Sequence, residues 1–183
     1  MHLSPTPIAG VFEAQTDPFR DQRGRLTRLF CLNDLRDAHA DRPIVQINHS
    51  LTHQLGTVRG LHFQRPPHAE AKWIRCLRGR VFDVAVDLRQ GSPTLLQWYA
   101  CELDADRQNA IFIPEGCAHG FQTLEPNSEL LYLHTAAYVP NAEGGLRYDD
   151  PRIGIAWPLP IGDVSDRDQR HARLDESFQG LTL

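Results

Sequence analysis

The chain has 183 residues, of which 41% are hydrophobic, and a formal net charge of −4 at neutral pH. Such mild acidity argues against non-specific binding to nucleic acid or to a membrane surface, because both require a basic excess. No apolar run approaches the ~20 residues that cross a bilayer, and the first residues show no secretory signal. We therefore expect a cytoplasmic protein, with a single domain over residues 1–183 and a core in about residues 21–160.

Alternation of apolar and polar residues with a period of two predominates along the chain and predicts strands. A first strand is expected at residues 24–31, followed by a short helix at residues 32–40 with Asn33 as its cap. Further strands are expected at residues 43–50, 57–64, 71–78, 80–88, 94–103, 110–113, 119–124 and 129–136. The tail from Pro158 onward is polar and irregular, with at most a short helix.

Turns rich in Pro and Gly separate the predicted strands, and the chain has neither a βαβ rhythm nor an internal repeat. Many short strands at this spacing predict an all-β protein, either an antiparallel sandwich or a barrel. Residues 80–88 give the clearest strand, with four apolar side chains on one face and a mixed set on the other. The apolar face holds Phe82, Val84, Val86 and Leu88.

Four predicted strands carry polar side chains on a face that would normally be apolar. These side chains are Gln46, Asn48 and Ser50, then His62 and Gln64, then Lys72, then Tyr132 and His134. Buried polar groups cost free energy unless they are paired, so polar inward faces predict a cavity that receives a polar ligand. The alternative is that these faces are exposed to solvent and that the opposite faces form the core.

Lys72 is the only lysine, whereas the other 18 basic residues are arginines. Lysine is a compact charge with a tunable pKa and arginine is a wide planar fork. Either Lys72 occupies a place that arginine cannot serve, or it survived by chance. The four cysteines, at 31, 76, 101 and 117, are scattered without a CxxC motif, so we expect them to be reduced and mostly buried.

Two loops add further candidates. In residues 114–121, Pro114 and Gly116 predict a tight turn that leads His119 into the next strand. In residues 56–64, Arg59 precedes Gly60. Arginine supplies a fork for phosphate or carboxylate, and glycine allows close approach of the backbone. Five further histidines (2, 39, 53, 68 and 171) are interpreted as solvated or local, and the three tryptophans (73, 98 and 157) as packing residues.

Together these segments resemble a known family. PxGxxH at residues 114–119 is similar to the second motif of the cupin jelly roll. RGLHFQ at residues 59–64, Lys72, AHGF at residues 118–121 and the Asp-Pro and Trp-Pro pairs at 150–158 closely resemble the dTDP-4-dehydrorhamnose 3,5-epimerase family. The resemblance extends over about residues 21–168. It implies an all-β cupin jelly roll of antiparallel strands with a few short helices.

The resemblance also implies a function. Members of this family are homodimeric isomerases that need no cofactor or metal and epimerise carbons beside the 4-keto group of a nucleoside-diphosphate 6-deoxysugar. His62 resembles the general base, oriented by Asp168 from the tail; Lys72 resembles the group that stabilises the enolate oxygen, and Tyr132 the proton donor on the opposite face. The residues expected to hold the substrate are Arg23, Arg28, Gln46, Asn48, Arg59, Gln64, His119, Tyr138, Glu143 and Arg167.

Elementary chemistry agrees with these roles. Abstraction of a proton beside a ketone suits a base that titrates near neutral pH, as histidine does, and the developing oxyanion is stabilised by a preorganised cation. Arg28 and Arg167 stand where the family often has Glu and Lys, which leaves the nucleotide open. The pathway, for a cell-surface polysaccharide or an antibiotic sugar, is also open.

Other functions stay open from the sequence. The closest alternatives are an epimerase of a single carbon (3 or 5) and a 3,4-ketoisomerase acting on a related nucleotide sugar. A metal-dependent cupin would use His62, Glu70 and His119 as ligands, although Lys72 beside them would repel the cation. A sugar-binding module without enzymatic activity would need the polar cavity but not the base, cation and donor.

Overall fold

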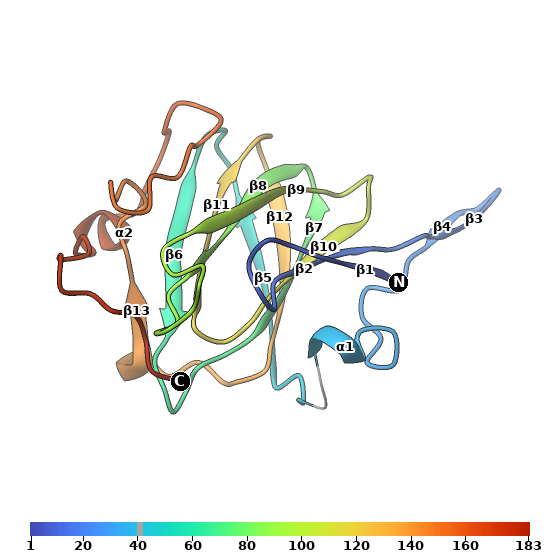
Figure 1. The fold of residues 1–183 in the computed structure, drawn as a ribbon. Coiled ribbons are helices and arrows are strands. Elements are labelled where there is room, and N and C mark those ends of the chain that lie inside the picture. Colours follow the sequence, from blue (N-terminus) through green and yellow to red (C-terminus); the bar gives the residue numbers. More distant parts are fainter. Residues whose placement is uncertain (40–41) are drawn as a thin grey trace.

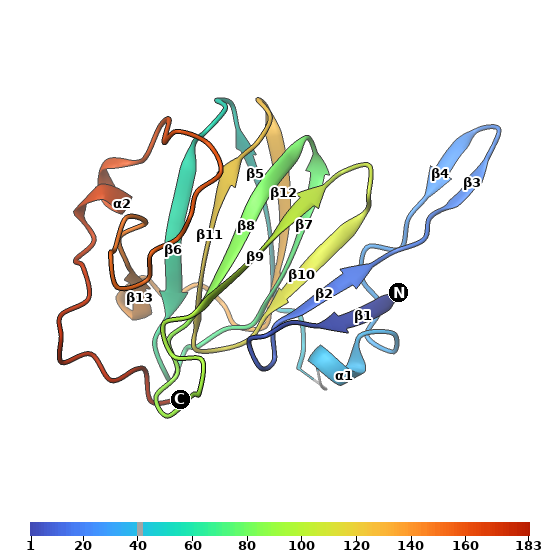
Figure 2. The same cartoon turned by 45° about the horizontal axis from the view of Figure 1, so that its top comes forward.

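The structure is a computed structural model that describes residues 1–39 and 42–183, and within these residues it contains thirteen strands and two short α-helices. Two antiparallel sheets face each other (Figures 1 and 2). The first sheet has six strands, in the order β1 (His2–Pro5), β2 (Phe12–Gln15), β10 (Asn109–Ile113), β7 (Lys72–Arg78), β12 (Ser128–His134) and β5 (Gln46–Thr52).

The second sheet has five strands, in the order β13 (Glu143–Gly145), β6 (Val58–Gln64), β11 (Cys117–Thr123), β8 (Arg80–Asp87) and β9 (Trp98–Asp104). A short 3₁₀-helix at Pro140–Ala142 leads into β13. The predicted all-β class is therefore confirmed. A two-residue-period pattern is what antiparallel pairing requires, since alternate side chains reach opposite faces of a sheet.

Side chains from both sheets meet in a central core. Ile74, Ile111 and Leu130 come from the six-stranded sheet, and Val81 and Phe121 from the five-stranded sheet. Burial of such apolar area is the main stabilising contribution to the fold. This core occupies one part of the space between the sheets, and the polar cavity described below adjoins it.

The strand β8 is buried on both faces. Val81 and Ala85 point into the central core, while Val84 and Val86 belong to a second cluster on the outer face of the sheet. That outer cluster is covered by apolar side chains of the C-terminal part of the chain, namely Leu146, Ile153, Trp157, Leu174, Phe178 and Leu181. The tail is irregular with one short helix, as predicted, but its apolar side chains also cover the sheet.

The helix α1 (Arg36–His39) and the segment before it cover the outer face of the six-stranded sheet. The predicted helix at 32–40 is shortened here, and its last residue, Ala40, lies outside the described residues. His39 is fully buried, which corrects its interpretation as a solvated or merely local residue. Trp73 Nε1 donates to His39 Nδ1 (3.2 Å), and His39 Nε2 lies 2.7 Å from the carbonyl of Arg42.

The first predicted strand, at 24–31, is wrong in length. Only β4 (Gly24–Leu26) is extended, and it pairs with β3 (Phe19–Asp21) in a hairpin that projects from the body of the protein (Figure 2). The strands β1, β2, β3 and β13 were not predicted. Segments of three or four residues are too short to display a period of two, and their pairing with distant strands stabilises them. The four cysteines are free, and Cys76 and Cys117 are buried.

Candidate active site

A cavity of about 570 Å³ is lined by side chains from both sheets. Lys72 on β7 and Tyr132 on β12 come from the six-stranded sheet, and His62 on β6 and His119 on β11 from the five-stranded one. The predicted polar cavity is therefore present. The residues predicted for the site that line it are Gln46, Asn48, Arg59, His62, Gln64, Lys72, His119, Tyr132, Tyr138, Glu143 and Arg167.

His62 and Asp168 form the most direct pair in the site. His62 Nε2 lies 2.7 Å from Asp168 Oδ1, and the Asp168 side chain is only 3% exposed. A carboxylate only accepts hydrogen bonds, so Nε2 carries a proton in this contact, and in the neutral imidazole Nδ1 has the lone pair. The pair thus leaves one imidazole nitrogen able to accept a proton from a bound molecule.

Asp168 is held by the backbone as well as by His62. It lies in the first turn of α2 (Asp166–Arg170), where Ser165 caps the helix and accepts from the Asp168 N–H (3.1 Å). Its second oxygen accepts from the Gly60 N–H at 3.1 Å. Gly60 has φ = +113°, and a Cβ there would lie 2.6 Å from the carbonyl oxygen of His119. Only glycine suits this close crossing of β6 and β11.

These contacts set the charge of Asp168. Burial by itself would raise the pKa of this carboxyl, but the hydrogen bond and charge of His62, the Gly60 N–H and Arg167 lower it to about 2. Asp168 is therefore ionised at neutral pH and stabilises a positive charge on His62.

His171 belongs to this group too, which corrects its interpretation as a solvated or merely local residue. Its ring meets the His62 ring edge-on with centroids 5.8 Å apart, and its Nε2 lies 3.7 Å from Asp168 Oδ1. Burial lowers the pKa of His171, and the neighbouring charge of His62 lowers it further. Its spacing of three residues from Asp168 was the only sequence signal, because one turn of helix places such residues on one face.

Within the described part of the chain, His62, Asp168 and His171 are also the three potential metal ligands whose atoms lie within 4.8 Å of one another. Arg167 Nη2 is 3.1 Å from His62 Nε2 and adds a positive charge there. The set considered for a metal-dependent cupin, His62, Glu70 and His119, does not form. Each of the three has another close partner instead.

Lys72 lies in a polar part of the cavity wall. Its Nζ is 3.0 Å from Glu70 Oε1, and both side chains are 9% exposed. Glu70 Oε2 is 2.7 Å from His134 Nδ1. Burial would raise the pKa of Glu70, but the His134 hydrogen bond and the Lys72 charge lower it. Neither Glu70 nor His134 was among the predicted site residues, although His134 was noted on a polar strand face.

Tyr132 and His119 lie side by side, with ring centroids 5.9 Å apart at an interplanar angle of 72°. Burial raises the pKa of the Tyr132 phenol, and the nearby Asp83 charge contributes in the same direction. Tyr132 therefore keeps its proton at neutral pH and is available as an acid. His119 Nε2 is 2.9 Å from Oδ2 of Asp83, a carboxylate that is fully buried.

The mouth of the cavity carries a second set of predicted residues. Tyr138, half of whose surface is exposed, donates its hydroxyl to Glu143 Oε2 at 2.9 Å. Arg167 Nη1 lies 3.2 Å from both oxygens of Glu143. Arg59 Nε donates to Thr52 Oγ1 at 3.0 Å. Two guanidinium groups thus lie close to the opening, where an anionic ligand would be attracted.

Gln64 is placed differently from the prediction. It lines the cavity but is only 3% exposed, and its amide is already bonded to the main chain. Nε2 donates to the carbonyls of His68 (3.1 Å) and Ala137 (3.2 Å), and Oε1 accepts from Val139 N (2.7 Å). Gln64 therefore holds the loop that carries Tyr138 rather than presenting a free amide.

Arg23 and Arg28 do not line the cavity of their own chain. Arg23 lies at the turn of the β3–β4 hairpin and bonds to Asp21. Arg28 Nη1 is 3.3 Å from Asp34 Oδ2. The β3–β4 hairpin projects away from both sheets (Figure 1), and neither arginine is among the residues that line the cavity. Sequence motifs alone carried no information on the direction of this hairpin.

Several known proteins are similar to this chain in sequence, in fold or in both, and three of them show the likeness. A family profile for dTDP-4-dehydrorhamnose 3,5-epimerase matches residues 5–176. A dTDP-4-dehydrorhamnose 3,5-epimerase from Sinorhizobium fredii is 42% identical over 183 residues, which cover 98% of this chain and 94% of the relative. A dTDP-6-deoxy-D-glucose-3,5-epimerase from Legionella pneumophila, solved with dTDP-4-keto-L-rhamnose, superposes with a TM-score of 0.91 at 31% identity, covering 98% and 97% of the two chains.

The third is a 3'-monoepimerase from Streptomyces bikiniensis, solved with dTDP-quinovose, which has a TM-score of 0.87 and 35% identity and covers 94% of this chain and 87% of its own. None of the described helices is long and apolar enough to span a membrane. The profile match, the relatives and the fold show that this chain is an isomerase of the dTDP-4-dehydrorhamnose 3,5-epimerase family.

Proposed function

We propose that the protein epimerises a dTDP-4-keto-6-deoxysugar at carbons 3 and 5, as a dTDP-4-dehydrorhamnose 3,5-epimerase. The observation that carries this proposal is that His62, Lys72 and Tyr132 line one cavity, with His62 on one sheet and the other two on the facing sheet. A base, a cation and an acid in one enclosed space are what removal and return of a proton beside a ketone require.

His62 takes the proton from the carbon next to the carbonyl through Nδ1, and the C–H electron pair moves to form the enolate. Asp168, ionised and 2.7 Å away, stabilises the imidazolium that results. The ammonium of Lys72 stabilises the enolate oxygen. Tyr132, on the facing sheet, returns a proton to the opposite face of the carbon. His62 then releases its proton to solvent and Tyr132 takes one back, which restores both groups, and a second cycle at the other carbon adjoining the carbonyl gives the double epimer.

The rest of the substrate meets the polar wall and mouth of the cavity. Arg59 and Arg167 are suited to the diphosphate, because a guanidinium offers paired donors to phosphate oxygens. Tyr138 is half exposed at the mouth of the cavity, near Glu143, and offers an aromatic surface to the nucleobase of the substrate. Gln46, Asn48 and His119 line the interior and are suited to the sugar hydroxyls.

A second candidate is epimerisation of a single carbon. It is favoured by the likeness to the S. bikiniensis protein, which is described as a 3'-monoepimerase and is 35% identical. The two candidates share His62 as base and differ in whether the sugar presents one or both carbons to it.

Proton NMR of dTDP-4-keto-6-deoxyglucose with the enzyme in deuterium oxide tests the function. Deuterium at carbons 3 and 5 supports the double epimerase, and deuterium at one carbon alone supports the second candidate. A parallel incubation with the corresponding UDP and GDP sugars shows which nucleotide is accepted. Without exchange at either carbon, the protein would not be an epimerase of this substrate.

We also propose a cytoplasmic homodimer in which residues 1–183 act as one domain. Phe19 and Leu26, paired across the β3–β4 hairpin, are 79% and 72% exposed, and a second copy would bury them. In that arrangement the hairpin brings Arg23 to the cavity of the second copy. Light scattering tests this proposal: Phe19→Asp with Leu26→Asp is expected to give monomers, and a wild-type monomer would contradict it.

A further inference from the structure

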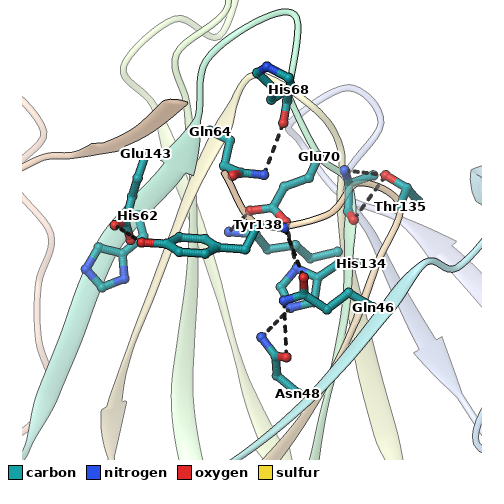
Figure 3. Close-up of polar contacts among 12 residues, drawn as sticks. Gln46, Asn48, His62, Gln64, His68, Glu70, His134, Thr135, Tyr138 and Glu143 are labelled. Atoms are coloured by element: carbon teal, nitrogen blue, oxygen red, sulfur yellow. Dashed lines mark hydrogen bonds and ion pairs between the residues drawn. The ribbon is translucent and has the colours of Figure 1, made fainter. Parts of the chain in front are cut away.

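Five polar groups continue from Lys72 along the cavity wall in a single hydrogen-bonded series (Figure 3). Glu70 lies between Lys72 Nζ (3.0 Å) and His134 Nδ1 (2.7 Å), with one oxygen on each. His134 Nε2 is 3.4 Å from Asn48 Nδ2. The side chains of Lys72, Glu70 and His134 are each no more than 10% exposed, so these contacts are shielded from water.

The series then crosses to β5 and ends on the main chain. Gln46 Nε2 donates to Asn48 Oδ1 at 3.2 Å, and Gln46 Oε1 accepts from the Tyr138 N–H at 2.9 Å. In the strand register, His134 of β12 lies between Gln46 of β5 and Lys72 of β7. Three neighbouring strands therefore place these side chains in one row across the sheet.

Because the series ends on a backbone N–H, the donor and the acceptor of each hydrogen bond in it can be assigned. A backbone N–H only donates, so Gln46 Oε1 must accept from Tyr138 and Gln46 Nε2 must donate to Asn48 Oδ1. Asn48 then has its amide nitrogen toward His134, and His134 Nε2 must accept. His134 is therefore neutral with its proton on Nδ1, and it donates to Glu70.

At the other end of the series, the Glu70 carboxylate accepts hydrogen bonds from both His134 and Lys72. The His134 hydrogen bond and the Lys72 charge lower its pKa against the effect of burial, so it stays a carboxylate beside Lys72. Lysine has a long, flexible stem that can adopt many rotamers. A fixed carboxylate at 3.0 Å limits the positions of Nζ before any substrate arrives.

We propose that Glu70 and His134 are positioning residues of the epimerase, which hold the Lys72 ammonium where the enolate oxygen forms and couple it to the loop that carries Tyr138. The role of Lys72 in this inference rests on the proposed function. The hydrogen-bonded series itself is independent of that function. Neither residue takes a proton from the substrate, and each acts through its neighbour.

Two substitutions of His134 separate its contact with Glu70 from its contact with Asn48. His134→Asn keeps an amide N–H near the position of Nδ1 and so keeps the donor to Glu70. His134→Gln instead places its amide near the position of Nε2, which keeps the acceptor for Asn48 and loses the donor to Glu70. Glu70→Gln leaves one oxygen for two donors and loses one contact. His53→Gln, at an exposed histidine outside the cavity lining, is the control.

The first measurement needs no substrate. Because Lys72 is the only lysine, protein labelled with ¹³C at lysine Cε gives a single side-chain signal. A held ammonium gives two distinct methylene proton shifts. We expect two distinct methylene proton shifts in wild type, His134→Asn and His53→Gln. In His134→Gln and Glu70→Gln we expect the two shifts to merge near the value of free lysine. An unchanged signal in His134→Gln would overturn the proposal.

The second measurement is turnover with the keto sugar. We expect kcat to fall about tenfold or more in His134→Gln and Glu70→Gln, with KM within about twofold, because a misplaced cation weakens transition-state stabilisation more than binding. His134→Asn should keep kcat within about threefold of wild type. Equal losses in His134→Asn and His134→Gln would contradict the role of the Nδ1 donor, provided thermal unfolding shows both variants folded.

The two measurements distinguish failure of the proposed function from failure of the positioning role of Glu70 and His134. If wild type shows no deuterium exchange with any keto sugar, the proposed function fails, while the lysine signal still decides whether Glu70 and His134 hold Lys72. If exchange is normal and the lysine signal of His134→Gln matches wild type, the positioning role fails and the proposed function stands.

Discussion

Asp168 Oδ1 lies 2.7 Å from His62 Nε2, although 106 residues separate the two in the sequence. The contact joins a helix of the C-terminal part to β6 and keeps the Asp168 carboxylate ionised, with a pKa lowered to about 2. It gives the base its partner and also contributes to stability, and these two effects can be measured separately.

Replacing Asp168 with Asn is expected to change how stability depends on pH. A folded-state pKa of about 2, against an ordinary value of 3.8, stabilises the folded protein by about 2 kcal/mol. Because the pKa is depressed, this stabilisation is complete above about pH 5 and is lost as the pH falls toward 2.

Urea unfolding from pH 7 to pH 2 checks the expectation. The difference between wild type and Asp168→Asn should be largest at neutral pH and should shrink below about pH 4. Asp166→Asn is the matched control, because the Asp166 side chain is 85% exposed and pairs with Arg170 on the surface. A difference that is constant over the whole range would contradict the prediction.

His62→Ala is expected to lower deuterium exchange into the keto sugar by about 10²–10⁴-fold, because His62 is the proposed base. Tyr132→Phe should still exchange the proton that His62 removes, while epimer formation falls strongly. Proton NMR in deuterium oxide reports both. Equal exchange by wild type and His62→Ala would exclude His62 as the base.

Lys72→Arg is expected to lower kcat by about 10²–10³-fold although the charge is kept. The guanidinium is wider and does not fit the space beside Glu70, where the two side chains are 9% exposed. Steady-state kinetics check this. Arg78→Lys, an exposed change on the same strand, is the control. Near wild-type turnover in Lys72→Arg would leave Lys72 as a general charge only.

Gln64→Glu tests the support of the Tyr138 loop. The new carboxylate cannot donate to the carbonyls of His68 and Ala137, so two main-chain oxygens in a partly buried position lose their donor. We expect a loss of about 2–4 kcal/mol in unfolding free energy and a rise in KM.

Gln90→Glu is the control for this change. Gln90 is exposed, and its Oε1 accepts from Thr182, which a carboxylate also does. At pH 8, calorimetry gives the change in unfolding free energy and steady-state kinetics give KM. If Gln64→Glu unfolds at the same temperature as wild type, the amide contacts to the loop would not matter for stability.

Gly60→Ala is expected to disrupt the crossing of β6 and β11. Its Cβ would lie 2.6 Å from the His119 carbonyl and 2.7 Å from Gly120 Cα, both of which are backbone atoms. Gly91 also has a positive φ, of +76°, but nothing lies within 4 Å of its added Cβ. Gly91→Ala should therefore cost only about 1 kcal/mol of backbone strain, and Gly60→Ala should cost several times more. Chemical denaturation compares the two, and equal losses would contradict the steric argument.

Local pattern was sufficient for much of the fold. The long strands β6, β7, β8 and β12 were predicted within one or two residues of their bounds, because seven or eight alternating residues specify a face. The same alternation revealed the polar faces, and thus most of the cavity lining, since a side chain that cannot be core must point elsewhere. The strands β1, β2 and β13 have too few residues for such a signal.

The amino-acid sequence by itself determined which side chains share a face and which chemistry they offer, because strand geometry repeats every two residues. Only the tertiary structure decided which residues from distant parts of the chain come into contact. It brought His171 to His62, engaged the Gln64 amide with the main chain, and placed Arg23 outside its own cavity. Each of these outcomes depends on the path of a loop or the closure of two sheets. Such contacts join residues that are far apart in the chain, so no local pattern encodes them.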